Sequence, residues 1–262
     1  MVELNRVAEI IEMQAPLETQ EGWDNSGWQI CLDHSAVSKV LVCLELNEAV
    51  AEEAISMGAD CIVCHHPLIF RGIKSVDHNE ITGKLIIRLI QKGVSVYATH
   101  TPFDKCAGGN NDYLAKLLNL QDVQPIPGDE TGICRMGVLP ESRSVQEVLK
   151  TFCDVSRQDI RHYRVVGNPE KSVQRIGICT GAGSEFMISA SAAGCDLYVT
   201  GDVKYHEAQH ALELNITVAD MGHFGSENIF TENMVQILKD AELDGVEIIP
   251  SSVNLNPFTF ME

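Results

Sequence analysis

Long runs of lysine and arginine are missing from this sequence, and positive charge is scarce throughout. The 262 residues hold 19 Lys and Arg against 37 Asp and Glu, a formal net charge of -18 at pH 7. Proteins that bind nucleic acids gain most of their affinity from clustered basic side chains that neutralise phosphates. We therefore expect no nucleic-acid partner and attribute the acidity to solubility.

Apolar runs long enough to cross a membrane are also missing, since no stretch approaches the roughly 18 apolar residues that a transmembrane helix needs. The first twenty residues lack the basic start and the apolar stretch of a secretory signal. The nine cysteines, odd in number and scattered through apolar segments, fit reduced thiols better than a disulfide framework. We expect a cytoplasmic protein with no membrane partner.

An internal repeat is the main organising feature of the chain. Residues 37–45 (VSKVLVCLE) match 173–181 (VQRIGICTG), and residues 58–64 match 194–200, at a constant shift of 136 residues (173 − 37 and 194 − 58). Each copy has the pattern of a buried strand, an amphipathic helix and a second buried strand. A helix, a third strand and a further helix follow in both. This alternation predicts parallel βαβ units.

The predicted fold class is therefore α/β, with two similar α/β lobes whose largely parallel sheets are flanked by helices and related by the repeat. The first lobe is expected at residues 1–120 and the second at 121–262. The second lobe would consist of a linking segment, 121–169, and repeat copy two. In copy one, the first helix is expected at 48–57, with Gly58 as its C-terminal cap.

Side chains that bind metals follow the predicted strands, where ligands collect in open α/β sheets. They are His65 and His66, His100 and Asp104, Asp202 with His206, and His223 and Glu227. The third strand of each copy thus ends in the same His-x-x-x-acid pattern, which packing alone does not require. Imidazole with carboxylate suits zinc, iron, manganese or cobalt, and carboxylates can bridge two ions. The residues indicate a metal site with these ligands: His65, His66, Asp104, His223 and Glu227.

Three other patterns have ordinary interpretations. His206 and His210 belong to an H-E-x-x-H sequence typical of zinc proteases, but nothing else in the chain indicates a protease. Cys61 and Cys64 would face opposite sides of a strand, which disfavours a shared metal. The glycine-rich segment 107–112 could hold a phosphate, although a turn with a helix cap is favoured. The remaining solitary histidines are interpreted as hydrogen-bonded side chains: His34, His78 and His162.

Taken together, the motifs resemble the NIF-three-like family, also called the GTP cyclohydrolase I type 2 homologues or dinuclear metal-centre proteins. The resemblance covers nearly the whole chain. Its motifs are Trp23-Asp24-Asn25-x-Gly27, residues 64–70 (CHHPLIF), His100-Thr101-x-x-Asp104, Thr200-Gly201-Asp202 with His206, His223-x-x-x-Glu227 and Asn256-Pro257-Phe258. One departure is Pro102, where the family commonly has Asn.

The resemblance implies two divalent metal ions per chain, of iron, zinc or manganese, at the five ligand positions named above. His100 and His206 would lie beside the site as substrate-contacting or proton-shuttling groups. A ring-like homohexamer is also implied. The expected function is that of a metal-dependent hydrolase, GTP cyclohydrolase-like, acting on a small nucleotide-like, phosphorylated or carbonyl-bearing substrate. The alternative is a non-catalytic protein that handles or binds metal as a scaffold.

Overall fold

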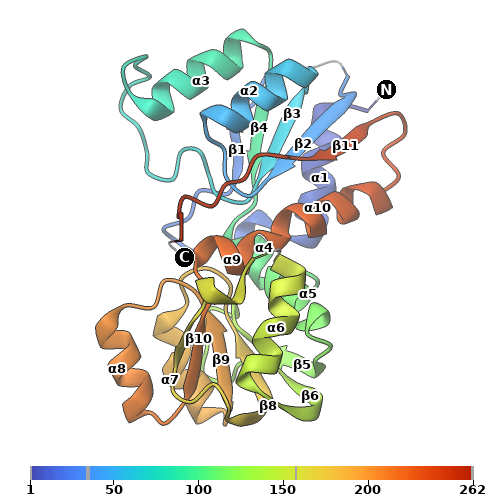
Figure 1. Ribbon diagram of the computed structural model, residues 1–262. Helices are drawn as coiled ribbons and strands as arrows, with labels where there is room; N and C mark the ends of the chain where they lie inside the picture. The colour runs from blue at the N-terminus through green and yellow to red at the C-terminus, as the bar shows by residue number, and fades with distance from the viewer. Residues whose placement is uncertain (1, 34–35, 157, 261–262) are drawn as a thin grey trace. The chain divides into compact units, whose positions relative to one another are not determined.

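The computed structural model describes residues 2–33, 36–156 and 158–260, and the chain divides into two compact units (Figure 1). Unit 1 comprises Met1–Cys106 and Phe230–Leu255, and unit 2 comprises Ala107–Ile229 and Asn256–Glu262. These units differ from the lobes expected at 1–120 and 121–262. The chain passes into unit 2 earlier than expected, and a later segment returns to unit 1 because its strand β11 pairs with β2. Among the described residues, no helix is long and apolar enough to cross a membrane.

Unit 1 is built on a five-stranded sheet in the order β1-β4-β3-β2-β11. Its centre is formed by three parallel strands of repeat copy one, namely β2 (Lys39–Cys43), β3 (Cys61–Cys64) and β4 (Ser95–Ala98). Strand β1 (Gly27–Ile30) runs antiparallel beside β4, and β11 (Glu247–Pro250) runs parallel beside β2. The central strands are almost wholly buried, as continuous apolar runs predict.

Helices α2 (Glu48–Met57) and α3 (Ile81–Gln91) cover one face of this sheet. Helix α2 has the predicted bounds and ends at Gly58, whose φ of +67° favours glycine. Helix α1 (Leu4–Gln14) lies against the other face, where the Tyr97 hydroxyl donates to Glu12 Oε1 (2.7 Å). The other elements of unit 1 are η1 (Leu17–Thr19), α4 (Thr101–Lys105) and most of α10 (Ile229–Asp240).

Unit 2 contains a six-stranded sheet in the order β5-β6-β8-β9-β10-β7. The strands are β5 (Gln121–Pro125), β6 (Arg135–Ser144), β7 (Arg164–Val166), β8 (Ser172–Ile178), β9 (Leu197–Thr200) and β10 (Thr217–Asp220). Strands β8, β9 and β10 are parallel, whereas β6 and β7 run antiparallel beside them. The short 3-10 helices are η2 (Ile160–His162) and η3 (Ser184–Phe186).

Two helices pack on each face of this second sheet. Helices α5 (Asn110–Leu117) and α6 (Val145–Ser156) share one apolar cluster with the strands. Helices α7 (Met187–Ala192) and α8 (Tyr205–Glu213) share another. Strand β9 divides its residues between the two clusters, with Leu197 in the first and Tyr198 in the second, as alternation along a strand requires. The α/β fold class is confirmed.

The repeat is visible in the pairing register of the two sheets. Val40 lies opposite Cys61 in β2 and β3, and Ile176 lies opposite Leu197 in β8 and β9, which preserves the shift of 136 residues. The third strands, β4 and β10, begin at residues 95 and 217, a shift of only 122 (217 − 95). The connection between the second and third strands is therefore shorter in copy two, and the repeat holds without a gap only through its second strand.

Candidate metal centre

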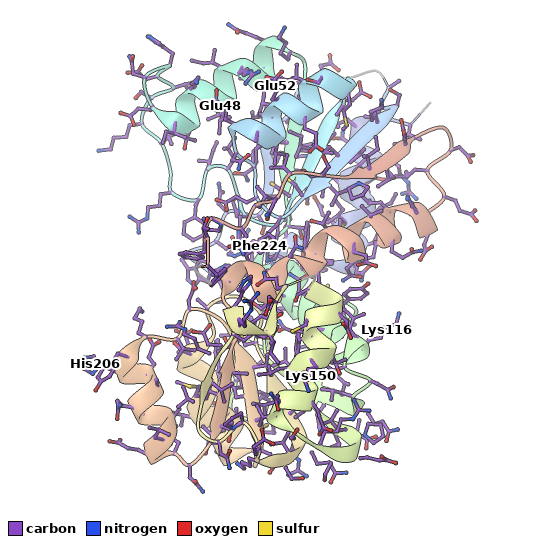
Figure 2. All side chains as sticks on the ribbon, in the orientation of Figure 1. Glu48, Glu52, Lys116, Lys150, His206 and Phe224 are labelled. Atoms are coloured by element: carbon purple, nitrogen blue, oxygen red, sulfur yellow. The ribbon has the colours of Figure 1, made fainter. Side chains whose placement is uncertain are left out.

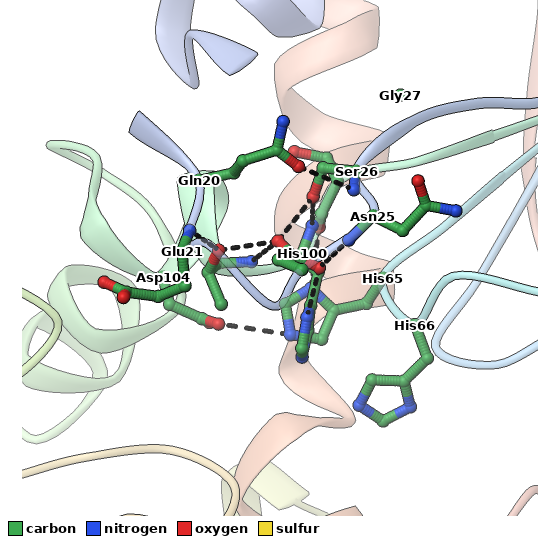
Figure 3. A network of polar contacts seen from close by, with 12 residues as sticks. Gln20, Glu21, Asn25, Ser26, Gly27, His65, His66, His100 and Asp104 are labelled. Atoms are coloured by element: carbon green, nitrogen blue, oxygen red, sulfur yellow. Dashed lines mark hydrogen bonds and ion pairs between the residues drawn. The ribbon is translucent and has the colours of Figure 1, made fainter. Parts of the chain in front are cut away.

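Three histidines meet at the carboxyl ends of β3 and β4 in unit 1 (Figure 3). His65 and His66 follow β3, His100 follows β4, and the ring nitrogens that they offer lie within 4.8 Å of one another. Asp104 of α4 adds a carboxylate, with Oδ1 3.5 Å from His65 Nε2. Imidazole and carboxylate are donors that divalent transition metals accept. The fold thus gathers three of the five predicted ligands, His65, His66 and Asp104, together with His100.

Hydrogen bonds determine which ring nitrogen His65 and His100 present. His65 Nδ1 donates to the backbone oxygen of Thr99 (2.8 Å), and because a carbonyl only accepts, the neutral ring keeps its lone pair on Nε2. His100 Nδ1 donates to Asp24 Oδ1 (2.9 Å), with the same consequence. Metal-binding histidines almost always have such a partner on the other ring nitrogen. Both rings therefore present Nε2 as the nitrogen that carries the lone pair.

Asp24 is the centre of a polar network whose role the sequence did not reveal. Its side chain is fully buried and accepts hydrogen bonds from Asn25, Ser26, His100 and Thr101. Burial raises the pKa of Asp24, but the bonds from His100 and Thr101 outweigh it and hold that pKa well below its usual range. Only the Trp23-Asp24-Asn25 motif could have drawn attention to Asp24, because its histidine partner is 76 residues away in the sequence.

The other two predicted ligands lie in unit 2, on the one-turn helix α9 (His223–Glu227). His223 Nε2 is 3.0 Å from Glu227 Oε2, and His223 Nδ1 donates to Asp202 Oδ2 (2.8 Å). Burial lowers the pKa of His223, but the carboxylates of Glu227 and Asp202 outweigh it and raise that pKa to about 10. With a pKa this high, the His223 imidazole is protonated at neutral pH and forms an ion pair with Glu227.

Gly181 keeps the space beside this pair clear of any side chain. Its φ of +70° lies in the left-handed region that favours glycine. A Cβ at this position would overlap Glu227 Oε1 and lie 3.5 Å from His223 Nε2. The Gly181 amide is fixed by donating to Ser226 Oγ (2.9 Å), so the close approach of the backbone is built into the fold.

The two His-x-x-x-acid patterns are not equivalent, which corrects the sequence interpretation. His100 is the second residue after β4 and precedes α4, whereas His223 is the third residue after β10 and begins α9. In unit 2 the imidazole faces the carboxylate of its own pattern. In unit 1 Asp104 faces His65, and His100 Nδ1 binds Asp24.

His206, the other candidate proton shuttle, is exposed near the start of α8 and projects outward from that helix (Figure 2). Its ring lies against Tyr205, with ring centroids 5.3 Å apart. In the H-E-x-x-H sequence, Glu207 Oε2 accepts a hydrogen bond from the Lys204 amide (2.7 Å) and caps α8. A carboxylate used as a helix cap agrees with the interpretation that this sequence is not a protease site.

The other patterns have structural roles. Cys64 packs in the apolar cluster beneath α2 and α3, and burial raises its pKa to about 12, so it is a thiol at neutral pH. Asp112 accepts from the Gly108 amide (2.9 Å), which makes the glycine-rich segment a turn before α5. Of the solitary histidines, His34 lies outside the described residues, His78 is exposed beside Asp77, and His162 stacks on Phe260 with centroids 3.6 Å apart.

Comparison with known proteins supports the resemblance over the whole chain. The profile of the Duf34/NIF3 family (NGG1p interacting factor 3) matches residues 2–257. A Clostridium perfringens protein named GTP cyclohydrolase 1 type 2 homolog is 32% identical over an alignment 265 residues long. The alignment covers 99% of this chain and 100% of that protein. A protein of the same name from Streptococcus pneumoniae is 32% identical over 262 residues, covering 97% and 98%.

Solved structures agree with the fold. The crystal structure of a Bacillus cereus protein related to NIF3 covers 99% of both chains with a TM-score of 0.89 at 22% identity. A Staphylococcus aureus hypothetical protein reaches the same TM-score and the same coverage at 24% identity. Identities this low support a shared arrangement of helices and strands and nothing finer.

Proposed function

The chain belongs to the DUF34/NIF3 family, and we propose that it is a metal-dependent hydrolase with a dinuclear metal centre. Its ligands would be His65, His66 and Asp104 from unit 1 with His223 and Glu227 from unit 2. The observation that carries the proposal is shared by His65 and His223. Each commits Nδ1 to an oxygen acceptor and turns Nε2 toward a carboxylate.

The donor set fits a pair of divalent transition metals. Of the proposed ligands, unit 1 supplies three and unit 2 supplies two, which in each case is fewer than the four that a closed zinc site normally uses. Two dications beside the carboxylates of Asp104 and Glu227 leave a net charge of about +2, which favours an anionic or carbonyl-bearing substrate. When bound, the ions would polarise the substrate's phosphoryl or carbonyl oxygen and lower the pKa of water.

His100 is the group that we assign to proton transfer. Its Nδ1–H bond to buried Asp24 fixes the ring and leaves a lone pair on Nε2, which can accept a proton from water or substrate. An ionised Asp24 also stabilises the imidazolium that results, in the manner of a carboxylate behind a catalytic histidine. His206 is exposed, its ring lies against Tyr205, and the described residues give it no hydrogen bond to a carboxylate, so we assign it no catalytic role.

The test is turnover by protein loaded with iron, manganese or zinc. GTP and simple phosphomonoesters are offered as substrates, and release of phosphate or formate is measured. We expect hydrolysis that falls at least about a hundred-fold in His100→Asn and Glu227→Gln and stays unchanged in His210→Ala on exposed α8. Metal-loaded protein that turns over none of these but passes iron to a metal-free acceptor would instead identify a metal-handling scaffold.

We further propose that the chain forms a homohexamer in the cytoplasm. Membership of the family supports the assembly. The nine cysteines are present as free thiols, which supports a reducing compartment such as the cytoplasm. Light scattering should then give a mass of six 28.8-kDa chains. A monomeric mass at micromolar concentration, or recovery of the protein outside the cytoplasmic fraction, would contradict this assignment.

A further inference from the structure

Two large aromatic side chains lie exposed beside the histidine cluster of unit 1. Trp23 is 57% exposed and Phe70 is 46% exposed, and their ring centroids are 5.9 Å apart with planes tilted by 48°. Exposed aromatic pairs of this kind gain only part of the burial that their area could provide. Clustered apolar surface next to polar, chemically active groups commonly marks a ligand site.

The loops that carry the two rings are held together by side-chain hydrogen bonds. Asn25 Nδ2 donates to the backbone oxygen of Ile69 (2.7 Å), and the Ile69 amide donates to Gln29 Oε1 (3.0 Å). Both backbone groups of the residue before Phe70 are thus tied to the segment that follows Trp23. The two loops that carry the aromatic pair are therefore joined before any ligand arrives, which lowers the entropy that binding would cost.

Both rings also contact the imidazole that we assign to proton transfer. The Trp23 and His100 centroids are 5.7 Å apart, the Phe70 and His100 centroids are 6.0 Å apart, and both pairs are edge-on with planes at 72°. The Trp23 ring, on which a flat ligand ring could stack, therefore lies next to the imidazole proposed for the chemistry.

We propose that Trp23 and Phe70 form a stacking subsite for a planar heteroaromatic ring of the substrate. The proposal rests on the proposed function and names the substrate class of that same site. The two rings are too close and too tilted to admit a third ring between them, so the substrate stacks on their exposed faces. Flat π surfaces match flat rings, and base–aromatic stacking changes affinity roughly ten- to a hundred-fold per ring.

The test uses metal-free protein, so that ring binding is measured without the metal centre. The chain has two tryptophans, and Trp28 packs edge-on against Tyr97, so a Trp28→Phe variant leaves Trp23 as the single fluorophore. This variant is titrated with guanosine and, as a non-aromatic control, with ribose. We expect saturable quenching by guanosine, none by ribose, and binding that is roughly ten- to a hundred-fold weaker when Phe70→Leu is added.

Several outcomes would overturn the proposal. One is the absence of saturable guanosine binding, and another is equal guanosine affinity with and without the Phe70→Leu substitution. A third is tighter binding of tetramethylammonium than of guanosine, which would indicate a cation site. A smaller oligomer in Trp23→Leu without any ring binding would assign the pair to a contact between subunits. Since metal content is measured separately, failure of ring binding and failure of the dinuclear centre are distinguishable.

Discussion

Replacing Asp24 by asparagine preserves the shape of the side chain but removes its charge and one of its two acceptor oxygens. Oδ1 accepts from Asn25 N (2.7 Å) and His100 Nδ1 (2.9 Å). Oδ2 accepts from Ser26 Oγ (2.9 Å), Thr101 N (3.1 Å) and Thr101 Oγ1 (2.6 Å). An amide offers one oxygen, and its nitrogen only donates, so one of these two groups of donors must lose its acceptor.

The amide oxygen of the Asp24→Asn variant should take the Oδ2 position, because three donors meet there against two at Oδ1. Two donors then lose a charged acceptor, and at about 1.5 kcal/mol for each such bond the free energy of unfolding should fall by about 3 kcal/mol. The amide nitrogen would face His100 Nδ1, so the ring would have to accept there and carry its proton on Nε2. The lone pair that we assign to proton transfer would be lost.

Urea denaturation of metal-free protein measures the first effect, and ¹⁵N NMR of histidine-labelled protein measures the tautomer of His100. Asp202→Asn in unit 2 is the matched control, since Asp202 is half exposed and binds His223 Nδ1. Asp202→Asn should lower the free energy of unfolding by less than about 1 kcal/mol. The reasoning is refuted if Asp24→Asn costs no more than Asp202→Asn, or if His100 keeps its proton on Nδ1 in the Asp24 variant.

Three further predictions rest on individual contacts. Gly181→Ala should displace Glu227 and lower both metal content and Tm. The control Gly58→Ala has a similar φ of +67° and open space around its Cβ, so it should lower the free energy of unfolding by only about 1 kcal/mol through backbone strain. Equal metal loss in the two variants would contradict this prediction. Burial raises the pKa of Glu53, but hydrogen bonds from the two serines after β11 outweigh it and lower that pKa. Stability from Glu53 is thus present above its unfolded pKa of about 4.3 and lost as pH falls through the folded value, so the deficit of Glu53→Gln in urea denaturation should shrink below about pH 4. His206→Ala should leave metal content and turnover unchanged, because that side chain is exposed on α8; a loss of either by elemental analysis or assay would return it to the site.

Much of the fold was predictable because local patterns determine it. Strands β3 and β9 are short apolar runs, which the sequence identifies as buried strands of the repeat. Helix α2 has an amphipathic pattern with a glycine cap, and the sequence predicts its bounds correctly. Strand β11 was missed because its edge position gives it only one well-buried residue, Ile248. No local signal indicates that this strand pairs with β2, which lies far earlier in the chain.

The candidate site was predictable in residue type but not in geometry. Histidines and carboxylates at strand ends indicate metal binding, and the repeat gives the same His-x-x-x-acid pattern in both copies. The structure, however, places Asp104 against His65 and gives His100 the buried Asp24. The two strand-to-helix turns also differ in length by one residue, which the spacing of the two patterns does not reveal. Gly181 was missed because its role depends on φ and on the side chain of Glu227, which is distant in the sequence.

The most direct test of the dinuclear centre is elemental analysis of protein purified without added metal. His65→Ala removes a donor from unit 1, Glu227→Ala removes one from unit 2, and His162→Ala is the control. We predict about two ions per chain in the wild type and in His162→Ala. Each of the other two variants should lose bound metal clearly, because the proposed centre needs the donors of unit 1 and those of unit 2. Absence of metal from the wild type, even after anaerobic reconstitution with iron, manganese or zinc, would contradict the account.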